Sequence, residues 1–384
     1  MASRCDKPFL PFEIIINILK RLPVKSIVRF RCVCKEWQNL FKTPSFIAEH
    51  LDHSDRKNPF LLLHEWGCER RGFIDGSEDW RHSLRLLDHK LETIEVLSIP
   101  SICSFGRRWK IIGSCNGLLC VQVDRCERRS PSSLWLWNPV IREVREVPNT
   151  PNDRRVCEVG FGFSSVVNDY KIVRFYSQEF PKNKVDRLYH HTMIDSVEVY
   201  SLSTGSWKEL KFGAFHIWEA FSKAVNVDGT IFWLDDPVVL SFDIATEVAT
   251  LTQLPNEDVL CPLGLGVYED KLVGHYVFIE EDGRLSSYAW VMKEVTSESG
   301  KSLSCTQKYK IDHGPHFLVY NLCFWRNEIV CPGKKYITKE GGRKCVLHMF
   351  NLNTNEEREF NCSTFCTRCD VFNYEKSLVS VWNN

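Results

Sequence analysis

Apolar residues recur with the 3.6-residue period of a helix only near the start of the chain. The first such run predicts a helix of about ten residues, with Pro11 at its first position and Pro23 stopping it. A second short helix is expected directly after Pro23, and a third carries Trp37 and ends before Pro44. Helices this short are marginal in water, so the three need neighbours or a partner.

From about residue 59 onward the pattern changes to short runs rich in Val, Ile, Phe, Tyr and Trp, separated by turn clusters. Two kinds of unit alternate along this part. One is a strand, a turn and a second strand, as in SLWLWNPVIREVREVP from Ser133 and VEVYSLSTGSWKEL from Val197. The other is a hairpin with a tight turn, as in IIGSCNGLLCV and KAVNVDGTIFWL. Two hairpins in a period of about 40 to 60 residues are typical of a four-stranded propeller blade.

The predicted fold class is therefore α+β and multidomain. A small three-helix domain at residues 1–52 precedes an all-β propeller-like domain of about six blades at residues 59–384. A pair of β-sandwich domains is the weaker alternative. Trp137, Trp207 and Trp233 recur at strand positions and are expected in the cores of the blades.

Composition narrows the possible partners. The 384 residues include 49 Lys plus Arg and 49 Asp plus Glu, without a long block of like charge, so no nucleic-acid partner is indicated. No apolar run is long enough for a signal peptide or a membrane span. We therefore expect a soluble protein of the cytoplasm, the nucleus or both, with no membrane partner.

The 17 cysteines are scattered through apolar patterns and are expected to be mostly free thiols. Cys362, Cys366 and Cys369 have the spacing C-x3-C-x2-C, and Cys345 and His348 could complete a zinc set. The favoured interpretation is three thiols on and between the last strands, with no metal.

Sequence motifs of catalysis are missing. The chain has no phosphate-binding glycine loop, no G-x-S-x-G and no H-E-x-x-H. His190 and His191 lie in a polar insertion that we interpret as a solvated loop. No catalytic residue and no cofactor are therefore predicted.

The segment LPFEIIINILKRLPVKSIVRFRCVCKEWQNLFKTPSFIAEHL closely resembles the F-box. The body resembles the F-box-associated domain of plant F-box proteins, a kelch-like β-propeller, in the pieces GSCNGLLCV, LWNP, GFGF, YKIVRF and GTIFWL. Cys34 stands where many relatives carry serine before the helix of Trp37, and a thiol is a poorer N-cap by roughly 1 kcal/mol.

The resemblance implies the substrate receptor of an SCF (Skp, cullin, F-box) ubiquitin ligase, which has no catalytic site of its own. The F-box would bind the Skp adaptor and through it the cullin, while the β domain would bind a target protein of unknown identity. A helical module with more apolar surface than it can bury is suited to this role on physical grounds as well.

The implied adaptor contacts are apolar residues of the helical segment with two lysines at the rim. They are Leu10, Pro11, Ile14, Ile18, Leu22, Pro23, Val24, Lys25, Val33, Lys35 and Trp37. Each apolar residue of the segment could instead lie in the internal core of the helices. Ile15, Leu19 and Phe30 are the strongest candidates for this internal role.

Target recognition is expected in loops that break the repeat, at residues 124–132, 177–192, 280–285 and 334–343. Two other functions stay open at this point. One is a propeller enzyme acting on a small molecule or a glycan, and the other is an F-box scaffold that does not direct degradation.

Overall fold

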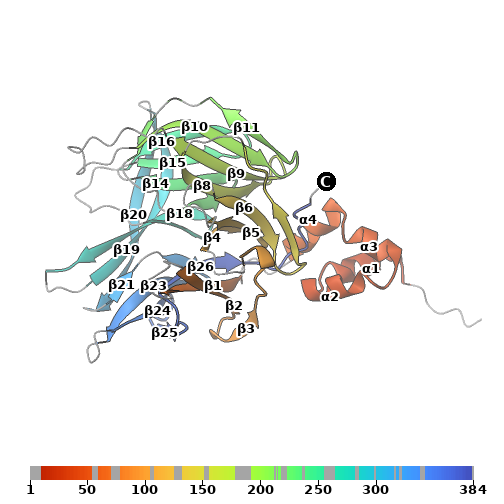
Figure 1. Ribbon diagram of the computed structural model, residues 1–384, viewed down its shortest axis with the longest axis horizontal. Helices are drawn as coiled ribbons and strands as arrows, with labels where there is room; N and C mark the ends of the chain where they lie inside the picture. Colours follow the sequence, from red (N-terminus) through yellow and green to blue (C-terminus); the bar gives the residue numbers. More distant parts are fainter. Residues whose placement is uncertain are drawn as a thin grey trace, which may run out of the picture.

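A ring of β-sheets forms the body of the protein, and the helices lie together at one side of it (Figure 1). The structure is a computed structural model. It describes residues 10–53, 59–70, 78–103, 108–124, 132–150, 155–177, 192–211, 213, 215–217, 223–235, 238–254, 264–281, 285–297, 300–314, 317–319, 322–337 and 342–382. Among the helices of this part of the chain, none is long and apolar enough to cross a membrane.

The helical module, residues 10–53, contains four helices rather than the expected three. They are α1 (Phe12–Leu19), α2 (Val24–Phe30), α3 (Lys35–Leu40) and α4 (Pro44–His53). The third helix ends before Pro44 as expected, and Pro44 is the first residue of the additional helix α4, where its missing N–H leaves no hydrogen bond unmade. Thr43 caps this helix, because its hydroxyl accepts from the N–H of Phe46 at 3.4 Å.

The β-rich body is a six-bladed propeller, which confirms the expected fold and blade number. The alternative prediction, a pair of β-sandwich domains, is therefore wrong. A short 3-10 helix, η1 (Ser101–Cys103), joins the first blade to the second. The first three blades are built from the strands β26 (Arg368–Tyr374), β1 (Phe60–Arg70), β2 (Glu78–Leu87) and β3 (Thr93–Val96); β4 (Trp109–Cys115), β5 (Leu118–Val123), β6 (Ser133–Asn138) and β7 (Glu143–Glu146); and β8 (Arg155–Ser164), β9 (Asp169–Ser177), β10 (Thr192–Ser201) and β11 (Ser206–Leu210), with β12 (Phe215–Ile217) beside β10.

The other three blades follow in chain order. They are built from β13 (Val225–Val227), β14 (Thr230–Asp235), β15 (Val238–Asp243) and β16 (Val248–Gln253); β17 (Gly264–Tyr268), β18 (Lys271–Ile279), β19 (Leu285–Ser297) and β20 (Gly300–Gly314); and β21 (Phe317–Val319) and β22 (Cys323–Trp325) beside β23 (Glu328–Ile337), β24 (Gly342–Asn351) and β25 (Glu357–Asn361).

The ring closes by pairing strands from opposite ends of the chain. The innermost strands β26, β4, β8, β13, β17 and β22 contact one another in that order and return to β26. In the first blade β26 pairs antiparallel with β1, with Leu63 opposite Val371. In five blades the two inner strands are consecutive in the chain and form the tight hairpin unit, namely β4–β5, β8–β9, β13–β14, β17–β18 and β22–β23. In the first blade the two inner strands are β26 and β1, which come from distant parts of the chain and form no hairpin.

The tight turns that join inner strands use backbone conformations with positive φ. Asn116 and Gly117 have φ of 47° and 79°, and Asp228 and Gly229 have 44° and 78°. Two-residue turns of this kind match the twist of the strands that they connect.

Large aromatic side chains fill the spaces between neighbouring blades. Trp137 and Trp233 are buried as predicted, and Trp207 is half-buried against the core between the second and third blades. Gly160 of β8, in the GFGF motif, faces Trp233 of the next blade so closely that an added Cβ would stand 2.1 Å from Cζ2 of the tryptophan. The glycine thus lets the indole lie flush against β8.

Replacing Gly160 with alanine should therefore destabilise the propeller by about 1–3 kcal/mol, because the indole has to move. The measurement is the denaturant midpoint of the purified protein. Gly213→Ala is the control, since an added Cβ there has nothing within 4 Å. Equal midpoints for the two variants would contradict this account of the packing.

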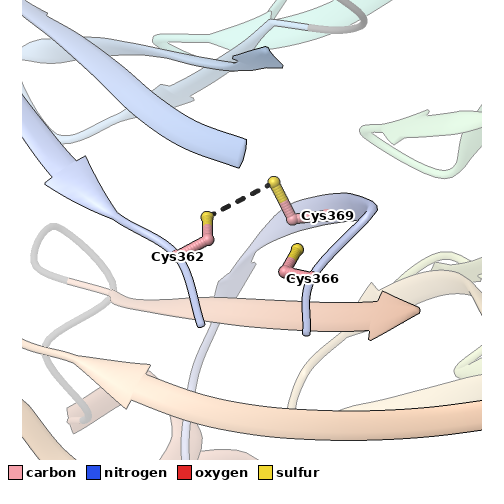
Figure 2. A group of neighbouring side chains, drawn as sticks. All are labelled: Cys362, Cys366 and Cys369. Atoms are coloured by element: carbon pink, nitrogen blue, oxygen red, sulfur yellow. Dashed lines mark hydrogen bonds between the residues drawn. The ribbon is translucent and has the colours of Figure 1, made fainter. Parts of the chain in front are cut away.

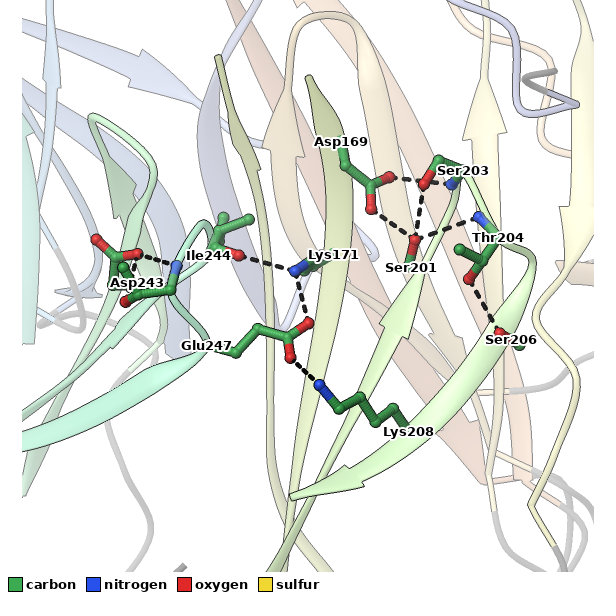
Figure 3. Close-up of polar contacts among 11 residues, drawn as sticks. Asp169, Lys171, Ser201, Ser203, Thr204, Ser206, Lys208, Asp243, Ile244 and Glu247 are labelled. Atoms are coloured by element: carbon green, nitrogen blue, oxygen red, sulfur yellow. Dashed lines mark hydrogen bonds and ion pairs between the residues drawn. The ribbon is translucent and has the colours of Figure 1, made fainter. Parts of the chain in front are cut away.

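Polar contacts join the third and fourth blades at their rims (Figure 3). The ammonium of Lys171, on β9, donates to the carbonyl of Ile244 at 2.8 Å and to Oε1 of Glu247 at 2.7 Å. Lys208, on β11, donates to Oε2 of the same carboxylate at 2.5 Å. Burial opposes ionisation of Glu247, but the hydrogen bonds from the two lysines outweigh it and hold the pKa of the carboxyl below its usual value.

These two lysines share an acceptor but differ in exposure, with 8% of the Lys171 side chain accessible against 66% for Lys208. Lys171→Met should cost about 1–3 kcal/mol of unfolding free energy, and Lys208→Met less than about 1 kcal/mol. The folded state lowers the pKa of Glu247. The ionised carboxylate therefore stabilises the fold at pH values above about 4.5, and this stabilisation is lost as the pH falls further. Denaturant unfolding at pH 7 and at lower pH should show the cost of Lys171→Met shrinking; a cost that does not change with pH would contradict the ion pair's role.

Candidate functional site

The helical module has a small core of its own. Its buried residues are Leu19, Val24, Ile27, Phe41 and Phe46, joined by Leu378 from the end of the chain. Ile15 and Phe30 pack against this core, which confirms the internal role considered for them and for Leu19.

A row of rings runs through that core. Phe30, Trp37, Phe41, Phe46 and His50 follow one another with centroids 5.2 to 6.1 Å apart. Burial lowers the pKa of His50, so the ring is neutral at pH 7 and its Nε2–H donates to the carbonyl of Leu22 at 2.9 Å. This hydrogen bond joins the loop after α1 to α4. Before α3, Cys34 Sγ accepts from the N–H of Trp37 at 3.4 Å, so the thiol does serve as the N-cap.

One side of the module is fixed to the propeller. Leu378 is buried in the core of the module, and Val140 and Ile141 of the β6–β7 turn pack against it. Lys25 of α2 pairs with Glu95 of β3 at 2.9 Å, and Lys376 pairs with the same carboxylate at 3.0 Å. Helices and blades are therefore packed as one body in this region.

The segment that reaches the module is itself held by the second blade. Asn138, the asparagine of the LWNP motif, is fully buried, and its Nδ2 donates to the carbonyl of Val379 at 2.7 Å. Its Oδ1 accepts from the N–H of Val140 at 3.0 Å. Ser377 donates through its hydroxyl to the carbonyl of Asn116 at 2.6 Å. One asparagine thus fixes both pieces of the propeller that touch the helices.

The other side of the module exposes large apolar side chains. Ile14 and Ile18, one turn apart on α1, are 45% and 49% accessible, and Val33 is 61% accessible. Leu10 and Phe12 at the start of α1 are exposed as well. Phe12 was missed by the sequence interpretation, because it falls outside the apolar spacing that defined the helix. Exposed apolar side chains gathered on one small module indicate a surface that another protein covers.

The structure brings most of the predicted contact residues to the exposed surface. Leu10, Pro11, Ile14, Ile18, Pro23, Lys25, Val33 and Lys35 are exposed. Leu22 and Trp37 are half-buried, whereas Val24 is almost fully buried in the core of the module. Val24 thus has an internal role, Lys25 is exposed and paired with Glu95, and Leu22 and Trp37 are only partly accessible.

Most residues of the predicted target-binding loops at residues 124–132 and 177–192 lie outside the described residues, as do His190, His191, and residues 282–284 and 338–341 of the loops expected at 280–285 and 334–343. The described residues of the last loop belong to strands, 334–337 to β23 and 342–343 to β24.

Models of two known protein families match this chain, one in the helical module and one in the propeller. The model of the F-box domain matches residues 9–49, and that of the F-box associated beta propeller domain matches residues 81–381. The chain belongs to this family of F-box proteins. The finer description of its propeller as kelch-like stays a prediction.

Similar proteins come from Arabidopsis thaliana. The putative F-box protein At3g10430 is 26% identical over 62% of this chain and 60% of its own length, and the probable F-box protein At5g47300 is 24% identical over 97% and 86%. For the first of these relatives, as for others like it, the match spans about three fifths of the relative's length. Among solved structures, TolB from Acinetobacter baumannii has a TM-score of 0.46 at 10% identity, over 85% of this chain and 69% of its own.

Leu378→Ala should loosen the F-box from the propeller, because it empties a site in the F-box core at a cost of about 2–5 kcal/mol. The expected result is faster hydrogen exchange in α2 and α4 with unchanged exchange in the blades on the far side. Leu251→Ala, at an exposed position of β16, is the matched control. Equal exchange in both variants would show that Leu378 does not hold the F-box.

Proposed function

We propose that this F-box protein is the substrate-recognition subunit of an SCF ubiquitin ligase. The observation that carries the proposal is the exposed apolar surface of the F-box, formed by Leu10, Phe12, Ile14, Ile18 and Val33. Helices of a Skp-type adaptor would cover this surface and connect the protein to the cullin. Membership of the F-box family supports the same partner.

In the proposed mechanism the protein catalyses no reaction itself and acts by holding the target close to the conjugating enzyme. Because Leu378 and the Lys25–Glu95 ion pair fix the F-box to the propeller, a target held by the propeller would keep a set position relative to the adaptor. A conjugating enzyme recruited by the cullin would then meet target lysines at high effective concentration. A rigid connection serves this mechanism better than a flexible linker.

The propeller supplies the target-binding surface in this proposal. Its sheets form a scaffold, and loops positioned by a scaffold of this kind are common sites of recognition. The cytoplasm, the nucleus or both would be the site of action.

Ile14→Asp combined with Ile18→Asp should weaken adaptor binding at least about 100-fold, because two carboxylates would be buried against an apolar partner. Binding of the purified protein to a Skp adaptor can be measured by calorimetry. Val166→Asp introduces the same residue at an exposed apolar position of the propeller and should leave binding unchanged. Binding that survives the double change would place the adaptor elsewhere.

Reconstitution with adaptor and cullin tests the ligase role itself. Target proteins can be found by affinity purification after proteasome inhibition, since degraded targets then accumulate on their receptor. A target that is ubiquitinated by the reconstituted complex supports a receptor, whereas a partner that binds and is never modified supports a scaffold.

A further inference from the structure

Four cysteine side chains converge where the last blade meets the first. Cys345 lies on β24, Cys362 directly follows β25, Cys366 lies in the connecting turn and Cys369 lies on β26. All four are buried and belong to one core cluster. The sequence spacing identified three of them and offered Cys345 and His348 as additions, and the fold places Cys345 with the three.

The sulfur atoms have the separation that a single tetrahedral ion needs. The Sγ atoms of Cys362, Cys366 and Cys369 all lie within 4.8 Å of one another, and those of Cys362 and Cys369 are 3.7 Å apart (Figure 2). With a zinc–sulfur bond of about 2.3 Å, the edge of a tetrathiolate tetrahedron is about 3.8 Å. The Cys345 side chain interacts with those of Cys366 and Cys369, so it lies beside the group of three sulfurs that are all within 4.8 Å of one another and is the candidate for the fourth ligand.

The backbone around the thiols favours this arrangement. Gaps of three and two residues separate Cys362, Cys366 and Cys369, within the range found between zinc ligands. The N–H of Cys362 donates to the carbonyl of Cys345 at 3.2 Å, which places the ends of two strands side by side. The thiol of Cys366 donates to the carbonyl of Arg368 at 3.0 Å.

A buried ion pair holds the loop that carries the thiols. Glu65 of β1 accepts from the N–H of Ser363 at 2.6 Å and from its hydroxyl at 2.9 Å. Arg85 of β2 donates to the same carboxylate at 2.6 and 3.0 Å, so no unpaired negative charge faces the sulfurs. Contacts of this kind fix the orientation of metal ligands.

His348 is not a fifth candidate. It lies three residues after Cys345 on β24, on the opposite face of the strand, and its Nε2 is 3.3 Å from a carboxylate oxygen of Glu357. The set is therefore four thiols without imidazole. A multi-iron cluster needs thiolates further apart than one ion does, because several irons and sulfides lie between them.

We propose that Cys345, Cys362, Cys366 and Cys369 bind one structural zinc ion. The ligands come from the last blade, from the turn after it and from β26 of the first blade, so the ion would fasten the strand that closes the ring. Four ligands from the protein leave no open position, which is typical of a structural site rather than a catalytic one.

The test is the metal content of the full-length chain, purified under reducing conditions without a chelator. Mass spectrometry should find about one zinc per chain, and Cys362→Ser combined with Cys369→Ser should lose it. Cys120→Ser combined with Cys331→Ser removes two equally buried thiols outside the cluster and should keep the zinc. Chelation should lower the melting temperature of the unaltered chain and leave that of the Cys362/Cys369 variant unchanged.

A second readout does not depend on the folding of a variant. Cobalt added to the unaltered chain after zinc removal should give the visible absorption of a tetrahedral tetrathiolate ion. A chain without zinc that takes up no cobalt would overturn the proposal. So would iron in place of zinc, or a disulfide between Cys362 and Cys369 in the protein as isolated.

Discussion

The pairing of β26 with β1 is the contact on which the rest of the molecule depends. Each blade buries its faces only against its neighbours, so an open ring would expose the apolar faces of the first and last blades. Leu61 and Leu63 of β1 and Val371 of β26 share one core with Leu347 and Met349 of the last blade. That core forms only when residues from the two ends of the propeller meet.

The same closing segment determines where the F-box lies. After β26 the chain crosses the second blade, where Asn138 holds it, and Leu378 then enters the core of the F-box. The internal face of the F-box is thus completed by Leu378, and the side with Ile14, Ile18 and Val33 stays exposed. Closure of the ring and exposure of this apolar side are consequences of one path of the chain.

Much of this architecture could be predicted from the sequence because the signals were local. The two alternating hairpin units are read within a few residues, and they correctly indicated six blades and buried tryptophans such as Trp233. Cys34 likewise acts as an N-cap within its own turn of helix. The helix that begins at Pro44 was missed, since proline suits both the segment after one helix and the first residue of the next.

Contacts between distant parts of the chain could not be predicted in this way. Nothing near Leu378 in the sequence shows that it completes the F-box, and Lys25 looks like any surface lysine until Glu95 lies beside it. Val24 was assigned to the contact surface from the resemblance to the F-box, and only the packing of α2 shows that it is buried. The sequence offered both Cys345 and His348 as additions to the three thiols, and only the position of β24 shows that Cys345 lies with them and that His348 lies beside Glu357.

The position of Leu378 also bears on how the protein is made. The F-box is synthesised first, but a residue of its core is synthesised after all six blades. A ribosome-bound or truncated chain would therefore carry an F-box that lacks part of its packing and its anchor. Only chains in which β26 and the segment through Leu378 have been made and folded would hold the F-box firmly in place.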